Sequence, residues 1–154
     1  MNDSEFRDRF LKTVENRENP FHVLVWINGD PVIGEGTYIG GFSEINAKGA
    51  SVVIGRYCDI ASFVAINTAD SHRRCIGLDE SNEKKNISIG DHVFIGSHSV
   101  ILGGADIGHH SVIGAGSVVR EGVIPPFSLV LGDVVKPGYY AAEYQAIHGT
   151  AQPK

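Results

Sequence analysis

The sequence has few of the residues that mark several common classes of protein. Its 154 residues include two cysteines, Cys58 and Cys75, and no C-x-x-C pair, so neither a structural zinc site nor a redox motif is supported. No apolar run approaches the roughly 20 residues that cross a bilayer, and the charged N-terminus lacks the apolar core of a signal peptide. The formal net charge is −5 without a long basic run, which argues against a nucleic-acid partner. We therefore expect a soluble, cytoplasmic protein that acts without nucleic acid or membrane.

Glycine, in contrast, is abundant, and much of it follows a repeat of six residues. From Ile89 to Val123 an Ile or Val recurs at every sixth position, with a small or β-branched residue four positions later. This period matches neither a helix nor a simple strand, and it predicts a short strand and a turn, repeated as a solenoid. Three such hexads per turn give a triangular prism, in which residues 18 apart stack at a strand spacing of about 4.8 Å. The predicted ladders are Ile89 over Ile107, Ile95 over Ile113, and Ile101 over Val119.

The same register extends toward the N-terminus with two interruptions. Hexads begin at Ile33, Ile39 and Ile45, and again at Ile54, Ile60 and Ile66. The nine-residue step from Ile45 to Ile54 predicts three extra residues within 47–53. Residues 67–88 are polar and lack the pattern, and the 23 residues from Ile66 to Ile89 exceed three hexads by five. We expect an inserted loop there, and loops carried on a rigid scaffold are where function concentrates.

The flanking segments predict small elements at each end of the repeats. The expected order is an amphipathic cap helix at 3–17, a strand at 21–27, the repeats, a last strand at 128–135 and a weak helical patch at 139–147. The domain prediction is an N-terminal cap at 1–20, a β-helix domain at 21–136 and a C-terminal tail at 137–154.

These features resemble a known family. The hexapeptide run, the polar loop with its single histidine and the later GAGSVV…PPFSLVLGD segment are similar to the left-handed β-helix acyltransferases, in particular the maltose/galactoside and CatB-related xenobiotic acetyltransferase group. The resemblance covers about residues 30–136 and implies an all-β fold, a left-handed parallel β-helix. It also implies a homotrimer with active sites between subunits. The implied activity is acetyl transfer from acetyl-CoA to a hydroxyl or amine of a sugar or nucleotide-linked sugar, with no metal required.

The implied chemistry needs a base for the acceptor proton and a donor for the developing oxyanion. Imidazole is the usual base because its unperturbed pKa is near 6.5. Of the seven histidines only His72 lies in the inserted loop, and the resemblance implies that it is the general base. Asp70 would orient the imidazole, as in a triad, or cap a turn. The candidate oxyanion donors are Asn46, Asn67 and backbone amides near Ser97.

The resemblance also implies where coenzyme A binds. Ser97 and Ala115 each follow an Ile-Gly pair and are 18 residues apart, so they should stack on adjacent coils and bond the pantetheine amides. Gly114, before Ala115, keeps this edge free of bulky side chains. Arg120 and Lys136 are the candidate cations for the phosphates.

Two other functions remain compatible with the same fold. A metalloenzyme of the γ-carbonic-anhydrase type needs three histidines around zinc. His92 and His110 would stack, but no third ligand is evident, and the fourth positions that His92, His98 and His110 occupy turn outward. The other alternative is a non-catalytic trimeric scaffold. Cys58, at a fifth position, is predicted to be a small core residue rather than a nucleophile.

Overall fold

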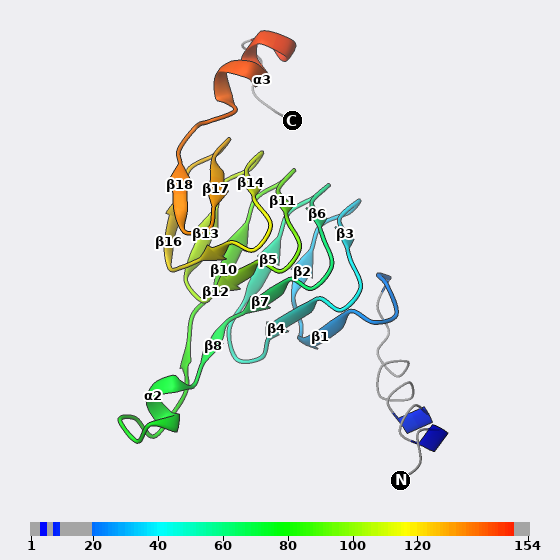
Figure 1. Cartoon of the computed structure of the whole chain (residues 1–154), viewed down its shortest axis with the longest axis vertical. Coiled ribbons are helices and arrows are strands. Elements are labelled where there is room, and N and C mark those ends of the chain that lie inside the picture. The colour runs from blue at the N-terminus through cyan, green and yellow to red at the C-terminus, as the bar shows by residue number, and fades with distance from the viewer. Residues whose placement is uncertain (1–3, 6–7, 10–19, 150–154) are drawn as a thin grey trace.

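The computed structural model describes residues 4–5, 8–9 and 20–149, and its main body is a prism of stacked coils with three sheets as its sides (Figure 1). Sheet A consists of β1 (Trp26–Gly29), β4 (Glu44–Ala47), β7 (Ala65–Asn67), β12 (Val100–Leu102) and β15 (Val118–Val119). Sheet B consists of β2 (Val32–Ile33), β5 (Val52–Ile54), β10 (Ile87–Ile89), β13 (Ala105–Ile107) and β16 (Gly122–Ile124). Sheet C consists of β3 (Tyr38–Ile39), β6 (Asp59–Ile60), β11 (Phe94–Ile95), β14 (Val112–Ile113), β17 (Leu129–Leu131) and the antiparallel β18 (Val134–Lys136). This stacked-coil prism is the architecture predicted from the repeat, and it agrees with the left-handed parallel β-helix that the resemblance implies.

The strand registers confirm the predicted ladders. All three pairs expected at a spacing of 18 are in register: Ile89 with Ile107, Ile95 with Ile113, and Ile101 with Val119. Ile33 pairs with Ile54, 21 residues later, which confirms the three extra residues in the turn between β4 and β5. The repeat therefore predicts which residue lies over which in the regular coils between Ile89 and Val119.

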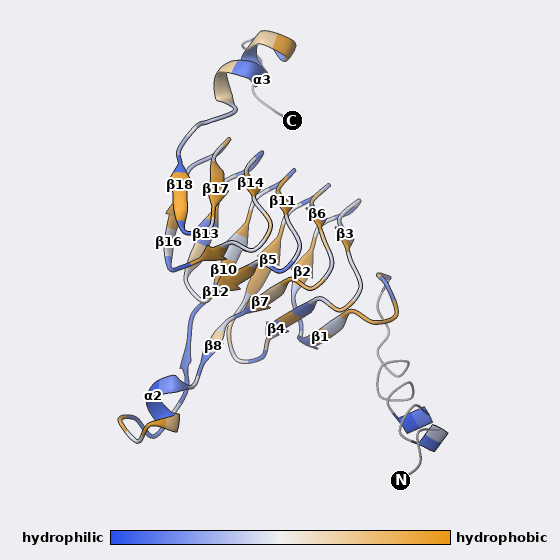
Figure 2. Cartoon of the chain, viewed as in Figure 1, coloured by the Kyte–Doolittle hydropathy of each residue, from blue (hydrophilic) through white to orange (hydrophobic). Residues whose placement is uncertain are grey.

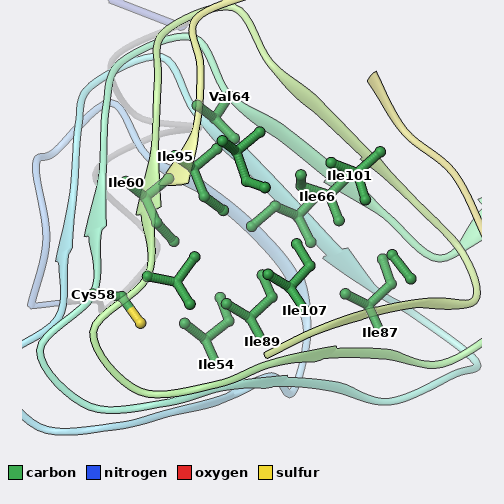
Figure 3. Packing of buried hydrophobic residues seen from close by; sticks show 14 of the residues in the cluster. Ile54, Cys58, Ile60, Val64, Ile66, Ile87, Ile89, Ile95, Ile101 and Ile107 are labelled. Carbon is green, nitrogen blue, oxygen red and sulfur yellow. The ribbon is translucent and has the colours of Figure 1, made fainter. Parts of the chain in front are cut away.

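The interior is filled by the first and fifth positions of the hexads. Eleven isoleucines have no more than 2% of their surface exposed, and Figure 3 shows several of them pointing into the prism from all three sheets. Buried serines occupy fifth positions and bond carbonyls of the neighbouring turns, as Ser99 Oγ does with the Gly114 carbonyl at 3.1 Å. Cys58 is 2% exposed, and burial raises the pKa of its thiol. The prediction that Cys58 is a core residue is confirmed.

Fourth positions of the hexads have a left-handed backbone, which turns their side chains outward. His92, His98 and His110 have φ of 56°, 62° and 57°. At the corner between sheets B and C this produces a column of rings: Tyr57, His92, His110 and Phe127, with successive centroids 4.7–5.3 Å apart. Tyr144 of α3 (Ala141–His148) covers the end of this column, with its ring centroid 5.0 Å from that of Phe127. His92 and His98 are exposed, whereas His110 is half-buried beneath α3.

The inserted loop differs from the prediction in size and in structure. Ile54 pairs with Ile89, 35 residues later, whereas regular coils repeat every 18, so a single coil carries 17 additional residues. The sequence-based count of five was wrong because it assumed that the segment completes a further coil. Residues 68–86 instead leave the prism as an arm: β8 (Ala69–Asp70) pairs antiparallel with β9 (Glu83–Lys84), and α2 (His72–Cys75) follows β8. Figure 2 shows that α2 is mainly hydrophilic.

The flanking segments differ in part from the elements predicted for them. The expected strand at 21–27 is present only in part: β1 spans Trp26–Gly29, five residues later at its start than predicted, and Ile27 lies beside Ile45. The expected single strand at 128–135 is two strands, because Gly132 has φ of 65° and the chain folds back as β18. The predicted tail helix is present as α3. Of the predicted cap helix, only residues 4–5 and 8–9 are described, and these are helical. In the described part of the chain, no helix is long and apolar enough to span a membrane.

Candidate functional site

The arm leaves the prism at the corner between sheets A and B, and its base is firmly held. Thr68 is 2% exposed, and its Oγ1 and N both donate to the Asn46 carbonyl, at 2.9 and 3.2 Å. The returning strand is tied to the outgoing one because Lys85 N donates to the Thr68 carbonyl at 3.0 Å. Between these anchors, the β8–β9 ladder places Asp70 opposite Glu83. The fold thus holds the base of the arm, and the predicted base His72 stands two residues beyond it.

Asp70 and His72 form a pair that resembles the orienting half of a catalytic triad. Asp70 Oδ1 lies 2.6 Å from His72 Nδ1 and also accepts the His72 backbone N–H at 2.9 Å. These two hydrogen bonds, the backbone one first, lower the pKa of the Asp70 carboxyl from its usual value. The carboxylate therefore stays ionised and holds the imidazole by Nδ1, which leaves Nε2 to exchange a proton. Both side chains are more than half exposed, at 63% for His72 and 55% for Asp70.

The two candidate asparagines are neighbours on stacked strands. Asn46 of β4 and Asn67 of β7 are in register, and Asn46 Nδ2 donates to Asn67 Oδ1 at 3.1 Å. The same Asn67 oxygen accepts the Ala69 N–H at 3.0 Å, which fixes the orientation of the amide. Asn67 lines the pocket beside the arm and Asn46 does not. Of these two predicted oxyanion donors, Asn67 is therefore the one whose side chain reaches the pocket.

This pocket, of about 210 Å³, lies between the base of the arm and the A–B corner of the following coils. It is lined by Asn67 and Asp70, by three further charged side chains of the arm and corner (Glu83, Lys85 and Glu121), and by Arg120. His72 does not line it. Lys85 Nζ lies 2.6 Å from a Glu121 carboxylate oxygen and 2.9 Å from one of Glu83. Its hydrogen bonds to Glu121 and then Glu83 raise the pKa of Lys85 to about 12. Within the described ranges, Arg120 forms no ion pair.

The residues predicted to hold coenzyme A fall in two places. Ser97 and Ala115 lie on adjacent coils at the C–A corner, where Gly116 N donates to the Ser97 carbonyl at 2.9 Å, so the predicted stacking is confirmed. A Cβ on Gly114 would lie 2.9 Å from a methyl of Leu131 and 3.1 Å from the Val130 carbonyl oxygen, so a larger residue there would require Leu131 to move. Arg120 is not at this corner: it follows β15, whereas Ala115 precedes it. Lys136 is farther along the chain in β18, with Nζ 5.6 Å from the centroid of the Tyr139 ring.

Sequence reasoning missed three charged residues of the pocket, Glu83, Lys85 and Glu121. The sequence shows Lys85 only as half of a Lys84-Lys85 pair, and nothing in it indicates that Glu121 lies beside the arm. It also did not indicate the contact between His109 and His110, whose Nδ1 atoms are 3.0 Å apart. No group of three or more His, Cys, Asp or Glu side chains that could hold a metal ion occurs in residues 4–5, 8–9 and 20–149.

Comparison of the sequence with known families and proteins finds several similar proteins. Residues 86–121 match the family model described as bacterial transferase hexapeptide (six repeats). Among curated proteins, the bifunctional protein GlmU of Streptococcus equi subsp. zooepidemicus is 29% identical over 132 residues, which cover 70% of this chain and 28% of that protein. The chain spans about a third of the length of the curated relatives it matches.

Solved structures show the same likeness. The polySia-specific acetyltransferase NeuO superposes with a TM-score of 0.59 and 28% identity, covering 73% of this chain and 59% of that one. A hexapeptide-repeat acetyltransferase from Vibrio cholerae superposes with a TM-score of 0.55 and 27% identity, covering 84% and 76%, and a structure of it with acetyl-CoA is also known. These comparisons show that the chain contains hexapeptide repeats and that it is similar in sequence and fold to hexapeptide-repeat acetyltransferases.

Proposed function

We propose that the protein transfers an acetyl group from acetyl-CoA to a hydroxyl or amine of a sugar or nucleotide-linked sugar. The observation that carries the proposal is the Asp70–His72 pair, held on an arm beside a polar pocket of a hexapeptide prism. The relatives support it: NeuO acts on polysialic acid, and the Vibrio cholerae protein has been solved with acetyl-CoA. The acceptor and the choice between oxygen and nitrogen are part of the proposal.

In the proposed reaction, His72 Nε2 takes the proton from the acceptor as it attacks the thioester carbonyl. Asp70 holds Nδ1 and stabilises the imidazolium that forms. The Asn67 side-chain amide, or a backbone N–H near Ser97, donates to the oxyanion. When the tetrahedral intermediate collapses, the carbon–sulfur bond breaks and the imidazolium returns its proton to the thiolate. The acetyl group passes directly to the acceptor, so no covalent enzyme intermediate forms.

The placement of the carrier residues favours a specific path for coenzyme A. The edge formed by Ser97, Gly114 and Ala115 precedes strands β12 and β15, and Arg120 follows β15. A carrier that bonds this edge and also reaches Arg120 would cross the outer face of sheet A, where Val118 is half-buried. Lys136 is the second cation proposed for the phosphates.

We also propose that the site is completed by a neighbouring subunit in a homotrimer. An Asp–His pair that is more than half exposed lacks the water-excluded surroundings in which acyl transfer is efficient. A second copy placed against the arm would supply the missing wall. Each of the three sites would then combine the arm of one subunit with the carrier edge of another.

The proposal is tested by measuring release of free CoA from acetyl-CoA with a panel of sugars and nucleotide sugars. With the best acceptor, His72→Ala should lower kcat by about 10²- to 10⁴-fold, the usual contribution of a general base. Asp70→Asn should lower it by a smaller factor, and His148→Ala, in the exposed part of α3, should leave it unchanged. Unchanged turnover in a folded His72→Ala protein would exclude the base assignment. No turnover, together with no thermal stabilisation by acetyl-CoA, would favour a non-catalytic scaffold.

A further inference from the structure

The position of the Asp70–His72 pair depends on a ladder of only two residue pairs. The arm contains 17 residues more than a regular coil, and the only strands described within it are β8 and β9. Asp70 is the last residue of β8, and the residue opposite it is Glu83. Two carboxylates directly opposite each other on neighbouring strands repel and would push the ladder apart. Something must hold β9 against β8 and place both over the prism.

Lys85 is positioned to do both. It follows β9 directly, and its Nζ lies 2.9 Å from Glu83, so it neutralises the carboxylate that faces Asp70. The same Nζ lies 2.6 Å from Glu121, which belongs to the corner two coils away, between β15 and β16. The ion pair therefore spans one complete coil and connects the arm to the far edge of the pocket.

The intervening corner has the residues that such a connection requires. Between Lys85 and Glu121 the chain passes through Gly103 and Gly104, which carry no side chains. A Cβ on Gly103 would lie 3.2 Å from Lys85 Cβ, and one on Gly104 would lie 2.8 Å from Glu121 Cγ. Either would displace one partner of the pair. Glycine at both positions allows the lysine and the glutamate to meet across this coil.

We infer that Lys85 and Glu121 are positioning residues, which hold the base of the arm and, with it, the Asp70–His72 pair beside the pocket. The inference rests on the proposed function for its effect on turnover. Both side chains are substantially exposed, at 36% for Lys85 and 62% for Glu121. Exposed ion pairs contribute little to global stability, so the pair matters for where the arm lies rather than for whether the prism folds.

The test is a double-substitution cycle on the full-length protein. Lys85→Gln and Glu121→Gln should each lower kcat by roughly 3- to 30-fold, since small displacements of catalytic groups have large effects on rate. The double variant should lose no more than Lys85→Gln alone, because that substitution already removes the contact with Glu121. Lys85→Arg should retain most of the activity. Lys84→Gln, the neighbouring lysine without an ion pair in the described part, is the matched control.

A second measurement separates this inference from the proposed function. Hydrogen exchange of the backbone amides at 69–70 and 83–85 should be faster in Lys85→Gln and Glu121→Gln than in the wild type, with the melting temperature nearly unchanged. If no acetyl-CoA turnover is found at all, the proposed function fails and the exchange data still decide whether the ion pair holds the arm. If wild-type exchange and kcat both persist in the two single variants, or if their kcat losses multiply in the double variant, the inference is wrong.

Discussion

Two adjacent valines in β5 provide a direct test of how the prism is packed. Val52 points inward and is 1% exposed, whereas Val53 points outward and is 43% exposed. Both follow the turn with three extra residues, so their orientation depends on the register being restored there. The substitutions Val52→Ala and Val53→Ala remove the same two methyl groups from the same strand. Any difference in their cost therefore reports burial alone.

The expected difference is large enough to measure. Removing two buried carbons from Val52 loses about 1.6 kcal/mol of transfer free energy. The cavity left in the filled prism adds about 1 kcal/mol, so the free energy of unfolding should fall by about 2.5 kcal/mol. Val53→Ala loses only part of this transfer free energy, and alanine is also less favourable than valine in a strand. Its free energy of unfolding should therefore fall by about 0.5–1 kcal/mol. For a chain of this size these losses correspond to melting temperatures lower by about 5–10 °C and about 1–4 °C.

Urea denaturation at equilibrium, followed by circular dichroism, is the suitable assay. Both variants should keep the m-value of the wild type, which shows that the same surface is exposed on unfolding. Thermal scans provide a second comparison between the two proteins. Equal losses in the two variants, or a greater loss for Val53→Ala, would refute the inward orientation of Val52 and with it the register of the coil after the enlarged turn.

Two further predictions concern residues at the corners of the prism, His110 and Gly103. Burial first, and then the charges of neighbouring histidines, lower the pKa of His110, so between that pKa and the unfolded value of about 6.5 the unfolded chain binds more protons. Stability should therefore decrease as pH falls through this window, and thermal scans of His110→Phe should show a weaker decrease. A Cβ on Gly103 would lie 2.8 Å from the Thr68 carbonyl oxygen, so Gly103→Ala should lower the free energy of unfolding in urea by about 1–3 kcal/mol. An unchanged midpoint would show that the base of the arm is less tightly packed than described.

The sequence alone was sufficient to predict the structure of the repeating coils. Each hexad repeats the same contact with the coil before it, so Ile89 and Ile107 could be paired by counting residues. The outward turn of His92 and the burial of Cys58 followed from their positions in the hexad. Local spacing determines these features, and no knowledge of distant segments is needed.

The structure of the segments that do not repeat was harder to predict from the sequence. The Lys85–Glu121 ion pair joins residues that are 36 apart in the sequence, at a corner that the six-residue period does not describe. In the sequence, this lysine and this glutamate look like any other exposed charged residues. Residues 128–135 were misassigned as one strand because a glycine with positive φ reverses the chain without interrupting the apolar pattern. The role of His72 stays a prediction that came from resemblance, and its contact with Asp70 is the part that the structure adds.

The antiparallel strand β18 has a consequence for self-association. A stack of parallel coils presents an open edge at its end, onto which a further coil or another molecule could add. In sheet C this edge is occupied, because β18 folds back onto β17 and pairs Leu129 with Lys136 in the opposite direction. A parallel strand can no longer pair with β17, and α3 covers the adjacent corner column. The C-terminal segment thus closes the sheet C edge at this end against pairing with another molecule.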